Sequence, residues 1–288
     1  MSLVGTSPTT PIQRFIQFLS KGIVQFVLIA VALFWLMPTI GLLITSLRPA
    51  ELFATSGWWQ AITTPSQLTL ENYQNLLGDS ELGDAILTTF YIAIPSTVLP
   101  VFFAAMAGYA LALVPFKGRD ALFLLVIAML VVPLQMALIP VFTLYRNLGI
   151  SGLPAIWLFH TAFGLPFAIF LMRNYFAGLP PSLVEAARID GANEWTIFRK
   201  VILPLGFPAI AALMIFQFTW TWNDLLVALV FATEQQPITL FLRNRLGEFS
   251  TGIGVISPGV FISAIVPLAI FFAFQKYFEA GLLGGSAK

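Results

Sequence analysis

Six long stretches of this chain contain no charged residue, and they constrain its fold more than any other feature. Each reaches or exceeds the ~20 residues that an α-helix needs to cross a bilayer. Lipid offers no hydrogen-bond partner to the backbone, so each crossing segment must be helical. We therefore predict an all-α membrane protein. Its six transmembrane helices are expected at residues 22–47, 85–113, 121–146, 153–175, 203–232 and 256–278.

Composition excludes several classes of function. Hydrophobic residues make up 58% of the chain and charged residues 9%, against about 25% charged in soluble proteins. A net charge of +1 is too small for a nucleic-acid-binding surface, so no nucleic-acid partner is expected. With no cysteine and one histidine, the chain offers no disulfide, thiolate metal site or multi-histidine metal site. It also lacks a phosphate-binding P-loop, so we expect no ATP bound to this chain and an energy source that lies elsewhere.

The basic residues predict how the helices are oriented. With the N-terminus in the cytoplasm, ten of the 14 basic residues face the cytoplasm, which fits the positive-inside rule. These are Arg14, Lys21, Lys117, Arg119, Arg173, Arg188, Arg199, Lys200, Lys276 and Lys288. The four that face outward are Arg48, Arg146, Arg243 and Arg245. Both termini are thus expected in the cytoplasm, with an uncleaved first helix. No linker or repeat divides residues 1–288, so one domain is expected.

The polar stretch from Leu179 to Leu205 lies between two predicted spans and reads as helix, break and helix. Pro180-Pro181 suits a helix start, and the spacing of Ser182 and Glu185 is that of a capping box. Gly191 is expected to stop the first helix in a left-handed conformation, and Asn193 to cap the second. From these signals alone, a solvated loop held by its caps is the simplest interpretation.

The stretch also resembles a family signature. Glu185-Ala186-Ala187, Asp190-Gly191 and Ile202-Leu203-Pro204 are similar to the cytoplasmic coupling motif of ABC importer permeases. Three further segments resemble the smaller permease subunit of maltose-type carbohydrate importers; they are Thr69–Tyr73, Trp222–Asp224 and Gln275–Phe278. The segments are similar in particular to those of permeases for α-glucosides, trehalose or glucosylglycerol.

The resemblance implies a multi-pass inner-membrane permease of the type I fold. Such a chain is a transport subunit, not an enzyme, and binds no cofactor itself. Residues 177–202 would form a coupling loop that enters a cleft on a separate ATPase, where ATP and magnesium bind. The residues implied in ATPase coupling are Glu185, Ala186, Ala187, Asp190 and Gly191. The implied partners are a second permease subunit, two ATPase subunits, an extracytoplasmic solute-binding protein, membrane lipid and a sugar.

The second polar cluster is Trp220-Thr221-Trp222-Asn223-Asp224, within the predicted span 203–232. A carboxylate within a membrane should face protein or water, and aromatic rings beside hydrogen-bonding groups suit sugars. Helped by the resemblance, we predict that Trp220, Trp222, Asn223 and Asp224 line the substrate path. An interfacial aromatic belt with a hydrogen bond between helices is the alternative. His160 is expected to pack or to bond between helices, with a role as a ligand as the alternative. Gln135 and Gln217 are expected to bond between helices, with a place on the path as their alternative.

Two other functions compete with the ATP-driven permease. A proton-coupled secondary carrier could use Asp224, and a channel or structural subunit would need no drive. Secondary carriers usually contain two related halves, and no internal repeat is visible here. A channel would not need a specialised cytoplasmic docking helix.

Overall fold

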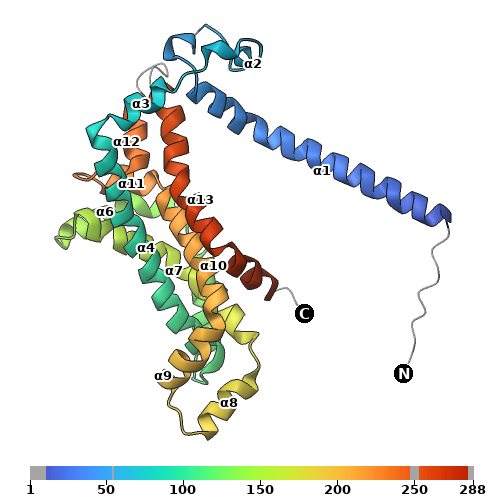
Figure 1. Cartoon of the computed structure of the whole chain (residues 1–288). Helices are drawn as coiled ribbons and strands as arrows, with labels where there is room; N and C mark the ends of the chain where they lie inside the picture. Colours follow the sequence, from blue (N-terminus) through green and yellow to red (C-terminus); the bar gives the residue numbers. More distant parts are fainter. Residues whose placement is uncertain (1–10, 54, 247–252, 285–288) are drawn as a thin grey trace. The chain divides into compact units, whose positions relative to one another are not determined.

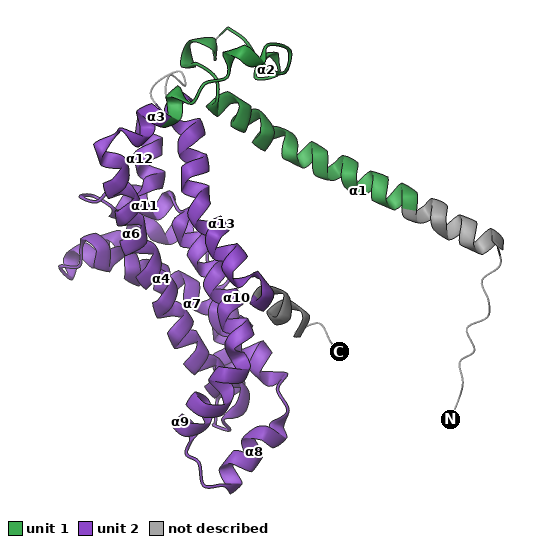
Figure 2. Cartoon of the chain, viewed as in Figure 1, with its two compact units in different colours: residues 1–73 green, residues 74–288 purple. Residues whose placement is uncertain are grey.

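The computed structural model describes residues 11–53, 55–246 and 253–284, and the described residues form helices without any strand. Side chains are described for residues 22–53, 55–246 and 253–277, which leaves out those of Arg14, Lys21, Phe278 and Lys288. Contacts divide the chain into unit 1, Met1–Tyr73, and unit 2, Gln74–Lys288 (Figure 2). The expectation of one domain stays a prediction, because this division does not decide whether the units fold separately.

Unit 1 consists of one long helix followed by short helical turns. Its elements are α1 (Pro11–Ser46), η1 (Ala50–Leu52), α2 (Gln60–Thr63), η2 (Pro65–Gln67) and the start of α3 (Glu71–Leu77). Arg48, only 1% exposed, holds the segment after α1 together: it donates to the side chain of Gln67 and to the carbonyl and hydroxyl of Ser56. Asn72 in turn donates to the carbonyls of Ser46 and Arg48. Neutral acceptors therefore satisfy this buried cation.

Unit 2 is a helical bundle (Figure 1). Its helices are α4 (Ser80–Leu113), α5 (Arg119–Met129), α6 (Leu134–Asn147), α7 (Gly152–Ala177), α8 (Pro181–Ile189), α9 (Glu194–Ile197), η3 (Phe198–Ile202), α10 (Leu203–Trp222), α11 (Leu226–Phe231), α12 (Ile238–Arg245) and α13 (Ile253–Gly284). Within this unit, α8 and α9 lie at one end and α12 at the other. Arg245 anchors α12 to the start of α4 through Asp79 at 2.7 Å and Glu81 at 3.0 Å.

Five described helical segments are long and apolar enough to cross a membrane: Gly22–Ser46, Ser80–Leu113, Gly152–Ala177, Glu194–Trp222 and Ile253–Tyr277. The expected span 121–146 is instead a pair, α5 and α6, bent by 99°. Pro133 precedes α6, and its missing N–H explains the interruption. Six spans therefore result only if this bent pair counts as one.

The fifth predicted span, 203–232, was also wrong as a single helix. The helix α10 ends at Trp222, and α11 begins only at Leu226. Asn223 and Asp224 lie in the break, where Asn and Asp side chains compete well for backbone hydrogen bonds. The polar cluster therefore marks a helix end rather than a helix centre.

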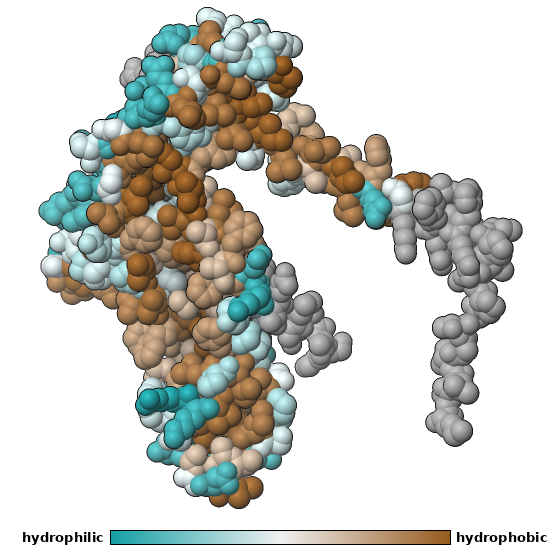
Figure 3. All heavy atoms as spheres, viewed as in Figure 1, coloured by the Kyte–Doolittle hydropathy of each residue, from teal (hydrophilic) through white to brown (hydrophobic). Residues whose placement is uncertain are grey.

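The main core of unit 2 joins α4, α7 and α10 to the polar loop between α7 and α10. Fully buried members include Met172, Phe176, Ile197, Ile202 and Leu213, and Val184 of α8 belongs to the same cluster. Hydrophobic residues also cover much of the middle of the unit's visible surface (Figure 3). The loop that carries α8 is thus packed onto the bundle and not merely tethered to it.

Candidate coupling site and translocation-path residues

The helix α8 has one face against the bundle and one face in the open. Val184 is 3% exposed and packs in the core, with Ala187 against the same cluster. Glu185 and Ala186 are exposed, and Ile189, one turn further on, is 86% exposed. Residues three and four apart share a helix face, so these three form one outward surface. We call Glu185, Ala186 and Ile189 the outward face of α8.

Local chemistry sets the limits of α8. Pro181 occupies the first turn as expected, but the capping-box prediction for Ser182 and Glu185 was wrong. The helix starts two residues too early for it, with Pro180 rather than Ser182 at the N-cap and no side-chain bond there. Gly191 has φ 79°, which confirms the predicted left-handed stop. Asn193 accepts from the N–H of Thr196 at 2.9 Å, which confirms the predicted cap of α9.

A polar network that the sequence analysis missed connects this loop to the end of α4. Arg188 Nε donates to Glu194 Oε1 at 2.9 Å, and its Nη2 donates to the carbonyl of Leu113 at 3.2 Å. The hydroxyl of Tyr109 donates to the other oxygen of Glu194. The carbonyls at the end of a helix lack helical donors, so a cation is favoured there. We call Arg188, Glu194, Tyr109 and the Leu113 carbonyl the α8–α4 tie.

The hydrogen bond to Glu194 raises the pKa of Arg188 further above its ordinary value. Arg188 therefore stays charged over the whole physiological range, and its end of the tie does not titrate. Sequence spacing offered only the six-residue separation of Arg188 and Glu194. Tyr109, 85 residues before Glu194, had no local signal.

The four predicted path residues do not share one environment. Trp220 is 39% exposed and Asn223 is exposed, its amide donating to the carbonyl of Thr219 at 2.8 Å. Trp222 is only 1% exposed; its ring packs on Phe90 and Phe218. No face of the Trp222 ring is therefore open to a sugar in this structure.

Asp224 stabilises the break after α10. Its carboxylate accepts from the N–H groups of Val227 at 3.0 Å and Ala228 at 3.3 Å, the first donors of α11. His160, 1% exposed, places Nε2 3.8 Å from this carboxylate and stands edge-on to the ring of Trp220. These contacts fit the expectation that His160 packs between helices, but 3.8 Å is too long for the expected hydrogen bond.

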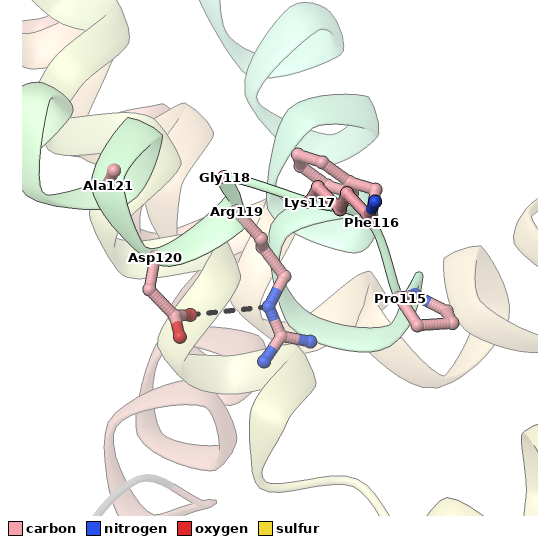
Figure 4. A pocket seen from close by; sticks show the side chains of 7 residues that line it. All are labelled: Pro115, Phe116, Lys117, Gly118, Arg119, Asp120 and Ala121. Atoms are coloured by element: carbon pink, nitrogen blue, oxygen red, sulfur yellow. Dashed lines mark hydrogen bonds and ion pairs between the residues drawn. The ribbon is translucent and has the colours of Figure 1, made fainter.

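Two hollows occur near the residues singled out from the sequence. One, about 10 Å³, lies beside His160, Thr221 and Asp224 and has room for at most one water. The other, about 530 Å³, is a wide hollow on one turn, lined by Pro115, Phe116, Lys117, Gly118, Arg119, Asp120 and Ala121 (Figure 4). There Arg119 pairs with the exposed Asp120 at 3.3 Å, as a solvated turn would. Neither hollow is an enclosed sugar site.

The apolar helices, with the short, half-exposed helix α8 outside them, define a multi-pass membrane protein. The chain belongs to the binding-protein-dependent transport system inner membrane component family, whose model matches residues 101–283. The family, the transport role and the inner-membrane location predicted from the sequence are therefore confirmed. The comparisons do not support the proton-coupled carrier.

Relatives of known name cover most of the chain. It is 44% identical to the osmoprotective compounds uptake permease protein GgtD of Synechocystis sp., over 97% of this chain and 96% of that protein. It is 49% identical to the alpha-glucoside transport system permease protein AglG of Rhizobium meliloti, over 78% of this chain. That match spans 62% of AglG's own length.

Solved structures share the fold. One is a chain of a bacterial ABC transporter involved in the import of the acidic polysaccharide alginate, with a TM-score of 0.72 and 24% identity. That alignment covers 95% of this chain and all of the other. A chain of the MetNI methionine ABC transporter gives a TM-score of 0.55 over 73% of this chain and 98% of its own. The predicted type I permease fold is thereby confirmed.

Proposed function

We propose that this chain is the permease subunit of an ATP-driven importer for a neutral di- or oligosaccharide or glucoside. The observation that carries the substrate class is the near full-length similarity to GgtD, together with the similarity to AglG. Their names refer to osmoprotective compounds and α-glucosides. The exposed amide of Asn223 and the ring of Trp220 are consistent with a neutral polyhydroxylated substrate.

The outward face of α8 is the proposed contact with the ATPase. Ile189 presents a large apolar side chain that is 86% exposed, and Glu185 adds a charge beside it. Such a face is what a helix inserted into a cleft on another protein requires. ATP and magnesium would bind to that partner, and two copies of it would serve two permease subunits. An extracytoplasmic binding protein would deliver the sugar.

Of the four residues predicted for the path, we propose Trp220 and Asn223 as lining residues. Asp224 supports the path by stabilising the break between α10 and α11, and Trp222 supports it as a buried residue that does not line it. The charge bias supports an orientation with α8 and both termini in the cytoplasm. The opposite end of unit 2, with α12, would face the binding protein.

The test is reconstitution of the assembled transporter in liposomes with its binding protein. Trehalose, an α-glucoside and glucosylglycerol should stimulate ATP hydrolysis and accumulate inside, whereas an acidic oligosaccharide should not. An Ile189→Asp variant should abolish ATPase capture, and the Leu148→Asp change, at an exposed residue outside the coupling loop, serves as the matched control. Stimulation by none of the neutral compounds would overturn the substrate class. Full ATPase capture by Ile189→Asp would overturn the coupling assignment.

A further inference from the structure

Prolines inside two long helices remove backbone donors. The helix α4 contains Pro95 and Pro100, and α13 contains Pro258 in its second turn and Pro267 further along. A proline has no N–H, so the carbonyl four residues before it loses its helical partner. For Pro95, Pro100 and Pro267, which lie deep inside their helices, the carbonyls affected are those of Tyr91, Ser96 and Ser263. In a membrane, water is not available to replace the missing donor, so each carbonyl needs a donor from the protein.

Each of these three carbonyls receives a side-chain N–H from another helix. The indole of Trp157 in α7 donates to the Tyr91 carbonyl at 2.8 Å. The amide of Gln217 in α10 donates to the Ser96 carbonyl at 3.2 Å. The indole of Trp222 in α10 donates to the Ser263 carbonyl at 3.0 Å and also reaches the Ser263 hydroxyl. Each of the three prolines, Pro95, Pro100 and Pro267, is therefore matched by one side-chain donor from another helix.

The packing around Gln217 is built for its bond. Gln217 is 4% exposed and Ser96 is fully buried, so water cannot substitute for the amide. A Cβ at Gly164 of α7 would lie 2.6 Å from Gln217 Nε2, closer than real contacts allow. The absent side chain at Gly164 thus leaves the space that the amide occupies on its way to α4.

We propose that Trp157, Gln217 and Trp222 are positioning residues for transport, because they tie α4, α7, α10 and α13 together at the proline sites. The helix α10 carries two of the donors and follows η3 directly, at the end of the coupling loop. A displacement of α8 and α9 by a partner is then transmitted through α10 to α4 by Gln217 and to α13 by Trp222. This assignment goes beyond the proposed function and does not depend on which sugar is carried.

The pairing makes a specific prediction about double variants. Gln217→Leu leaves the Ser96 carbonyl unsatisfied and should lower the folded-to-unfolded ratio roughly 5- to 100-fold. Pro100→Ala restores an N–H at the position that can bond Ser96 within α4. It should therefore rescue much of the loss caused by Gln217→Leu. Pro95→Ala restores a donor for Tyr91 instead, and should not rescue Gln217→Leu.

The indole donors allow conservative variants that keep a ring. Trp157→Phe should be rescued by Pro95→Ala and not by Pro100→Ala, and Trp222→Phe should be rescued by Pro267→Ala alone. Each arm is measured twice on the assembled transporter. Thermal melting in detergent reports stability without any substrate, and sugar molecules moved per ATP hydrolysed report coupling.

We expect matched rescue in melting and a lower transport-per-ATP ratio in each single variant. Rescue by mismatched prolines, or rescue by neither proline, would overturn the pairing. If the melting arm shows matched rescue while the coupling ratio stays unchanged in the stable single variants, the positioning role is refuted. Failure to identify a transported sugar would affect the proposed function and leave the melting arm intact.

Discussion

Replacing Arg188 by methionine should weaken the connection between the coupling loop and α4. The Arg188–Glu194 pair, at 2.9 Å, has side chains that are 35% and 46% exposed. An ion pair exposed to this extent contributes about 0.2–1 kcal/mol. The bond from the same guanidinium to the Leu113 carbonyl adds about 1 kcal/mol. Together they stabilise the docked loop by about 1.5 kcal/mol, which is roughly a tenfold change in the docking equilibrium.

The assay is a double-mutant cycle in proteoliposomes, with sugar transported per ATP hydrolysed as the readout. Arg188→Met alone should lower this ratio while the transporter still assembles, because Val184 remains packed in the core. Glu194→Gln should lower it less, since the amide oxygen still accepts from Arg188. Adding Glu194→Gln to Arg188→Met should then cost little more. Arg119→Met is the matched control, because among the described residues Arg119 forms its ion pair with its sequence neighbour Asp120. An unchanged ratio in Arg188→Met, or strictly additive effects, would refute the tie.

Three further predictions use the same transporter. Gly191→Val should strain a backbone at φ 79° by about 1–2 kcal/mol and reduce ATPase co-purification, whereas Gly191→Asn should keep it; equal capture by both would contradict the turn's role. Asp224→Asn retains an acceptor for the start of α11 and should keep uptake, including when an uncoupler is added at constant ATP. Asp224→Ala removes that acceptor and should lower stability in thermal melting by about 1 kcal/mol. Loss of uptake in Asp224→Asn and with the uncoupler would reinstate the proton-coupled carrier. Because the chain has no cysteine, single cysteines report topology cleanly: a membrane-impermeant reagent applied outside should label Glu71→Cys and not Glu185→Cys, and the reverse pattern would invert the predicted orientation.

Most of the fold could be predicted from charge-free runs and helix caps. Membrane crossing and helix termination both depend on residues that are close together in the sequence, so the sequence shows them directly. The φ of Gly191 and the cap at Asn193 are examples of such local control. The break between α5 and α6 was missed since a long apolar run looks the same whether it is straight or bent. The α8–α4 tie was missed because its bond from Tyr109 to Glu194 spans 85 residues.

The division of labour within Trp220-Thr221-Trp222 follows from helix geometry. Residues two apart in an α-helix point about 200° away from each other, so two such rings cannot line the same path. The structure leaves Trp220 39% exposed beside His160 and buries Trp222 against Phe90. The indole N–H of Trp222 then meets the carbonyl that Pro267 released. Two tryptophans in this motif suggest that both rings stack on a sugar. The structure instead leaves the ring of Trp220 exposed and turns the ring of Trp222 inward as a hydrogen-bond donor. The helix period and the N–H that Pro267 lacks together explain this arrangement.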